Sequence, residues 1–97
     1  MAKQLKSVFT DDMDTCIFTA SPYVERHHIF GGSYRELSEI FGFVVPVRYD
    51  LHPNGVHADP RYRKEIDEYL KKMAQEYFEK HYGTREDFRN IFGKSYL

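Results

Sequence analysis

Residues 27–57 carry four of the five histidines of this 97-residue chain, and this clustering limits the folds that the chain can adopt. The window opens on the adjacent pair His27 and His28, and it closes on His52 and His57, which flank a turn. Histidine is the commonest metal ligand in proteins, and the donors of one ion come from separate chain segments. The sequence therefore predicts a fold that brings these segments together around a metal ion with a catalytic base beside it.

The histidines divide between two roles. His27, His52 and His57 would supply three nitrogen donors and leave a position on the metal open for water or substrate. His28 would then be a general base, since a neutral imidazole accepts a proton near pH 7. Two alternatives stay open: a closed structural zinc site that uses all four side chains, and histidines that serve only the core or the surface.

Arginine would complete a phosphodiester site, because its guanidinium binds a phosphate through two hydrogen bonds. Arg26 and Arg35 are the nearest candidates. The formal net charge is −1, from 14 basic and 15 acidic side chains. This balance weighs against tight, autonomous, non-specific nucleic-acid binding, so any DNA would be bound through a local patch, a metal ion or a partner protein.

Composition predicts one small soluble domain. Hydrophobic residues make up 41% of the chain, and eight Tyr and eight Phe can fill a core. The single cysteine, Cys16, excludes an intrachain disulfide and favours a reducing compartment. No apolar run approaches the roughly 18 residues of a membrane span, so we expect a cytoplasmic protein without membrane contact.

Local patterns predict an α+β fold. Strands are expected over residues 23–30 and 43–47. Between them, Ser33 is the expected N-cap of a helix over residues 34–41, with Glu36 completing a capping box and Gly42 ending the helix. This helix is expected to bury Leu37, Ile40 and Phe41.

Two further helices are expected in the C-terminal part. Asp59 and Pro60 should begin the longest helix, whose apolar residues recur at helical spacing until about His81. Thr84 should cap a short last helix, with Asp87 at the capping-box position.

Several segments together resemble a known family. They are Arg26-His27-His28-Ile29-Phe30-Gly31-Gly32, Gly42-Phe43-Val44-Val45-Pro46-Val47, His52, and Gly55-Val56-His57. The chain resembles the HNH (ββα-metal) endonucleases over residues 14–97, and most closely the small phage-borne HNH proteins.

The resemblance implies a ββα-metal core, in which a short β-hairpin followed by a helix surrounds one divalent ion (Mg²⁺, Mn²⁺, Ni²⁺ or Zn²⁺). It implies a single domain over residues 1–97, with an N-terminal extension (1–14), the metal-binding core (16–59) and a C-terminal helical part (60–97). His27, His52 and His57 would be ligands and His28 the base. The implied activity is hydrolysis of DNA to 5′-phosphate and 3′-hydroxyl ends, by a phage-encoded protein in a bacterial cytoplasm.

The chain departs from the family pattern at two places. Many relatives hold a structural zinc with two Cys-x-x-Cys pairs, but Cys16 stands alone here, with Thr19, Arg48 and Leu51 at the other three positions. We therefore expect no structural zinc, with apolar packing in its place. The central Asn of many members is also absent, and Gly42 and Phe43 stand about where it would fall.

Two other functions remain open. One is a catalytically weak or inactive HNH-scaffold accessory or inhibitor protein that binds a phage or host protein, such as a host nuclease. Its support is the near-neutral charge, the missing Asn and the tyrosines of the C-terminal half, Tyr62, Tyr69, Tyr77 and Tyr82. The other is a small zinc-stabilised nucleic-acid-binding domain, which the even balance of charges disfavours.

Overall fold

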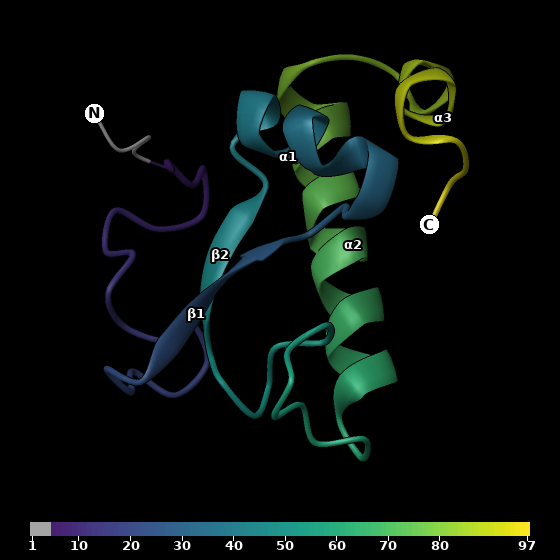
Figure 1. The fold of residues 1–97 in the computed structure, drawn as a ribbon. Coiled ribbons are helices and arrows are strands. Elements are labelled where there is room, and N and C mark those ends of the chain that lie inside the picture. Colours follow the sequence, from purple (N-terminus) through teal and green to yellow (C-terminus); the bar gives the residue numbers. More distant parts are fainter. Residues whose placement is uncertain (1–4) are drawn as a thin grey trace.

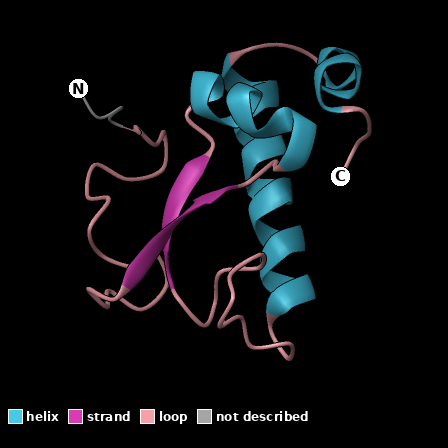
Figure 2. Ribbon diagram, viewed as in Figure 1, coloured by secondary structure: helices cyan, strands magenta, loops and turns pink. Residues whose placement is uncertain are grey.

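A computed structural model describes residues 5–97, so the first four residues of the predicted N-terminal extension lie outside it. Over this range the elements are β1 (Val24–His28), a 3₁₀ turn η1 (Gly32–Tyr34), α1 (Arg35–Phe41), β2 (Val44–Arg48), α2 (Arg63–His81) and α3 (Arg85–Phe92). The two strands cross on one side of the long helix α2, and α1 and α3 lie toward its C-terminal end (Figures 1 and 2). The predicted α+β class is confirmed.

The sheet consists of β1 and β2, which pair antiparallel with His27 opposite Val45 and His28 opposite Val44. Both strands were predicted, and both are slightly displaced or shorter at their ends. The connection between them contains η1 and α1, and His28 is the last residue of β1, separated by three residues from the start of η1 at Gly32. Side chains of a strand alternate between faces, but a terminal position allows His28 to reach the same site as His27.

The start of α1 differs from the prediction. η1 draws residue 33 into a 3₁₀ turn, and the N-cap of α1 is Tyr34, which forms no side-chain capping bond. The predicted Ser33 capping box is therefore wrong. The predicted end is confirmed, because Gly42 adopts a left-handed conformation (φ 77°) and donates its N–H to the carbonyls of Glu39 and Ser38.

The buried face of α1 is also displaced. Ile40 is 68% exposed, so its predicted burial is wrong, while Leu37 and Phe41 pack against the core. Ser38 is buried instead, and its hydroxyl accepts from the N–H of Phe30 (3.0 Å) and donates to the carbonyl of Phe30 (2.8 Å). This pair of hydrogen bonds holds α1 against the chain that leaves β1.

The longest helix begins later than predicted. α2 starts at Arg63, because Asp59 accepts hydrogen bonds from the backbone N–H and guanidinium of Arg61 in the preceding turn and does not cap the helix. The capping box of Thr84 and Asp87 at the start of α3 is confirmed, with both reciprocal hydrogen bonds formed. Within the described residues, no helix combines the length and apolarity that crossing a membrane would require.

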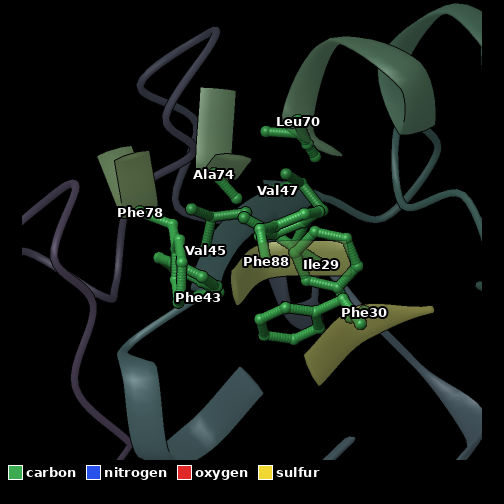
Figure 3. Close-up of a cluster of buried hydrophobic side chains, with 10 residues drawn as sticks. Ile29, Phe30, Phe43, Val45, Val47, Leu70, Ala74, Phe78 and Phe88 are labelled. Carbon is green, nitrogen blue, oxygen red and sulfur yellow. The ribbon is translucent and has the colours of Figure 1, made fainter. Parts of the chain in front are cut away.

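The core lies between the sheet, α2 and α3, and it is rich in phenylalanine (Figure 3). Its fully buried members come from both strands, the segments beside them and the two C-terminal helices: Ile29, Phe30, Phe43, Val45, Val47, Leu70, Ala74, Phe78, Phe88 and Phe92. Burying this apolar surface is the main favourable contribution to folding. It also fixes the C-terminal end of β1, where the histidine pair lies.

Cys16 joins two turns that are distant in the sequence. Its buried sulfur accepts hydrogen bonds from the backbone N–H groups of Arg48 (3.2 Å) and Phe18 (3.4 Å). The N–H of Leu51 donates to the carbonyl of Arg48 (2.8 Å), and the N–H of Ala20 donates to the carbonyl of Cys16 (2.9 Å). The turn that begins at Cys16 and the turn that begins at Arg48 therefore lie against each other, held by these hydrogen bonds.

Candidate functional site

A cavity of about 250 Å³ lies at the end of β1 and collects most of the predicted site residues. Its lining consists of Arg26, His27, His28, Gly31, Gly32, Arg35, His52 and Asn54. The predicted base, both predicted arginines and two of the three predicted metal ligands therefore meet in one hollow. They come from β1, the first turn of α1 and the loop that follows β2.

His27 is the least satisfied polar side chain of this cavity. It is 1% exposed, and its Nε2 is the one buried side-chain nitrogen or oxygen without a hydrogen-bond partner among the described residues. Its ring meets the ring of His52 edge to face, with 4.9 Å between centroids. Buried polar atoms are almost always satisfied, so an orphaned imidazole nitrogen beside a second imidazole indicates a missing partner such as a cation.

The orientation of His52 is fixed by Glu25. The Nδ1 of His52 donates to the Oε1 of Glu25 (2.7 Å), since an ionised carboxylate can only accept. The proton therefore lies on Nδ1, and Nε2 keeps its lone pair for another partner. This is the carboxylate–histidine arrangement found behind metal-ligating imidazoles. A Cβ at Gly55 would lie 2.7 Å from the same Oε1, so glycine is needed at that position for the pair to form.

His28 has its own carboxylate. Its Nε2 lies 3.0 Å from the Oε1 of Glu39 on α1, and both side chains are largely buried. The carboxylate places the proton on Nε2 and leaves Nδ1 as the nitrogen that can accept one. This arrangement orients the imidazole as a general base requires.

The structure does not bring His57 to this cavity. Two successive turns separate His57 from His52: the N–H of Gly55 donates to the carbonyl of His52, and the N–H of Ala58 donates to the carbonyl of Gly55. The ring of His57 is exposed and contacts the ring of Tyr49, with 6.1 Å between centroids. Over residues 5–97, no group of three His, Cys, Asp or Glu side chains is arranged to hold a metal ion.

A divalent ion nevertheless fits the donors of His27 and His52. One is buried and unsatisfied, and the other has a lone pair held in place by a carboxylate. Cations in phosphoryl-transfer sites often take their remaining ligands from water and substrate phosphate. Two imidazoles in a hollow flanked by arginines would leave such positions open.

Burial, together with the charge of Lys71 and the charges that His52 and His28 carry when they are protonated, lowers the pKa of His27 from 6.5 to about 3. His27 is therefore neutral at physiological pH, which is the form that binds a metal.

This shift predicts acid destabilisation. Between pH 6.5 and about 3 the unfolded chain binds a proton on His27 that the folded chain does not, so stability is full above pH 6.5 and falls as the pH is lowered. We expect this group to contribute about 2 to 3 kcal/mol of loss between pH 7 and pH 4.5. Urea unfolding of wild type and His27→Gln with a chelator present would measure it. The exposed His57→Gln variant is the control, and equal pH slopes for wild type and His27→Gln would contradict the assignment.

Sequence reasoning missed three residues around the site. Glu25 lies two positions before His27 on the same face of β1, and that period was the signal that could have identified it. Asn54 lines the cavity from the loop after β2, although the sequence showed it only as a turn residue. Glu39 carried no local signal, because its contact with His28 depends on how α1 packs.

No protein-family model, curated protein or solved structure matches this chain significantly.

Proposed function

We propose that this protein is a metal-dependent HNH-type endonuclease that hydrolyses DNA phosphodiester bonds. The observation that carries the proposal is the buried, unsatisfied Nε2 of His27 beside the carboxylate-oriented His52, in one cavity with His28, Arg26 and Arg35. The contact between the turns at Cys16 and Arg48 adds support, because the resemblance puts the two Cys-x-x-Cys positions of many HNH proteins at these two turns. The proposal includes the ββα-metal core that the resemblance implies.

The residues divide the reaction between them. His27 and His52 would hold the divalent cation, which would supply stabilisation of negative charge on the phosphate and the leaving oxygen. His28 accepts the proton of the attacking water through Nδ1, while Glu39 keeps its ring in place. Arg35 is exposed at the rim of the cavity, where its guanidinium can hold a phosphate oxygen.

Arg26 also lines the cavity and can serve the same purpose. Its guanidinium lies 3.8 Å from the carboxylate of Asp14, and both side chains are well exposed. An exposed ion pair of this kind contributes little energy, so a phosphate can replace the carboxylate.

Plasmid nicking tests the proposal. Supercoiled plasmid is incubated with purified protein and Mg²⁺, Mn²⁺, Ni²⁺ or Zn²⁺ in turn. We expect nicked or linear product with at least one metal, and none with a chelator. Absence of cleavage with all four metals would contradict the proposal.

Metal affinity should depend on Glu25 although Glu25 is not a ligand. Replacing it with Gln removes the carboxylate that orients His52, and loss of such a partner typically weakens metal binding 10- to 100-fold. We expect that loss for Glu25→Gln in a calorimetric titration with Ni²⁺ or Zn²⁺, and a larger loss for His52→Ala. Glu65→Gln on the exposed start of α2 is the matched control. Unchanged affinity in Glu25→Gln would exclude the carboxylate–histidine arrangement.

The same titration decides the place of His57. A loss in His57→Ala comparable to that in His52→Ala would make it the third ligand. An unchanged affinity would leave that position to water or substrate.

The alternative function, a protein-binding accessory or inhibitor role, is favoured by one surface feature. Phe18 and Tyr69 are 41% and 56% exposed, and their rings contact each other with 5.9 Å between centroids. Tyr77 and Tyr82 contact Phe43 of the core, and Tyr82 is also 47% exposed. Inhibition of a host nuclease that survives His28→Ala and is lost in Tyr69→Ser would support this function.

A further inference from the structure

A second cavity adjoins the histidine cavity. It has a volume of about 380 Å³ and lies between the loop after β2 and the N-terminal half of α2. Gly31 and Asn54 line both cavities, so the two hollows lie side by side, and we call the pair the depression. A chain molecule that passes over Gly31 and Asn54 would contact both hollows.

The lining of this depression is basic, although the whole chain has a formal net charge of −1. Among the described residues, five arginine and lysine side chains line the two cavities against one acidic side chain, Asp67. The whole chain has 14 basic and 15 acidic residues. The depression is therefore the kind of local patch that a polyanion requires on a protein of net charge −1.

The basic side chains of the second cavity differ in how strongly they are held. Lys71 is paired with Asp67 (3.0 Å) and lies over the ring of Tyr96. Lys64 is highly exposed, and its nearest carboxylate, that of Glu68, is 4.0 Å away. Arg63 is exposed, and no ion pair joins it to another residue of the described chain. Arg63 and Lys64 thus present charge to a ligand with little internal compensation.

We propose that the second cavity binds the phosphodiester backbone of DNA, with Arg63 and Lys64 as the phosphate contacts, on one side of the phosphate held in the histidine cavity. This inference rests on the proposed function, because it takes DNA as the substrate of the neighbouring site. It adds the path of the DNA strand: from the end of β1, past Asn54 and along the start of α2. Figure 1 shows the two elements β1 and α2.

Binding without cleavage tests the inference. A fluorescein-labelled DNA duplex is titrated with protein in a chelator, and anisotropy gives the dissociation constant between about 50 and 200 mM salt. We expect Arg63→Glu/Lys64→Glu to weaken binding at least tenfold at the low-salt end. Each lost phosphate contact should also lower the slope of log K against log salt by about 0.9.

The matched control is Lys72→Glu/Lys80→Glu, which makes the same change of charge on the exposed surface of α2 at residues that do not line the cavity. We expect it to retain most of the wild-type affinity and the wild-type slope. Circular dichroism and urea unfolding establish that both double variants are folded.

The outcomes separate this inference from the proposed function. Equal losses of affinity in the two double variants, or no loss in Arg63→Glu/Lys64→Glu, would contradict DNA binding by the second cavity. Neither outcome would change the interpretation of the nicking assay. A loss of affinity confined to Arg63→Glu/Lys64→Glu, in a protein whose wild type never nicks plasmid, would support DNA binding by the second cavity. It would contradict the proposed endonuclease activity.

Discussion

Replacing His28 with alanine is expected to reduce metal-dependent DNA cleavage by roughly 10²- to 10⁴-fold, the usual contribution of a general base. The imidazole is held by Glu39 at 3.0 Å and lines the same cavity as His27 and His52. Without it, the only imidazoles that line the cavity, among the described residues, are those of His27 and His52, which are the proposed metal ligands. Single-turnover nicking of supercoiled plasmid at saturating metal measures the loss.

The interpretation depends on metal binding and folding being unchanged. Because His28 is a base and not a ligand in this proposal, His28→Ala should bind the cation with nearly wild-type affinity. His81→Ala is the control, since His81 is exposed on the last turn of α2 and contacts Tyr77 away from the cavity. Wild-type cleavage by His28→Ala would show that the base lies elsewhere.

Replacing Phe43 with alanine should cost about 3 to 5 kcal/mol of unfolding free energy, a large part of the roughly 5 to 15 kcal/mol available to a small domain. Phe43 is 0% exposed, and its ring contacts Phe9, Phe30, Phe41 and further aromatic rings at centroid distances of 5.8 to 6.4 Å. Truncation would leave a cavity that these rings cannot all move to fill.

Urea unfolding followed by circular dichroism measures this cost as a lower midpoint. Tyr23→Ala is the matched control, because it also removes an aromatic ring but from a side chain that is 71% exposed. Its expected effect is within about 0.5 kcal/mol. A Phe43→Ala midpoint equal to that of Tyr23→Ala would show that the aromatic cluster does not support the fold.

The prediction of local structure succeeded where a short stretch contained its own signal. Gly42 ends α1 in a left-handed conformation, and Thr84 with Asp87 caps α3, because both features depend only on neighbouring residues. It failed at Ser33 and Asp59, which are suitable N-caps by type. In the folded chain Ser33 lies within a 3₁₀ turn, and the carboxylate of Asp59 accepts hydrogen bonds from Arg61.

The candidate site was predictable in part of its membership but not in the pairing of its side chains. Five residues selected from the sequence line one cavity, because the histidine pair ends a strand and the loop after the second strand must return past it. The sequence could not show that His52 turns inward and His57 outward. That difference depends on the turn geometry around Gly55 and on the carboxylate of Glu25.

Residue types and local spacing were enough to predict the α+β class, the two strands and the histidines near the site, and the single cysteine excludes an intrachain disulfide. The folded structure was needed to identify the unsatisfied nitrogen, the carboxylates that orient His28 and His52, and the proximity of Arg63 and Lys64 to the site. Those features arise from contacts between segments distant in the chain, and their positions are fixed by how the sheet and α2 pack around the shared aromatic core.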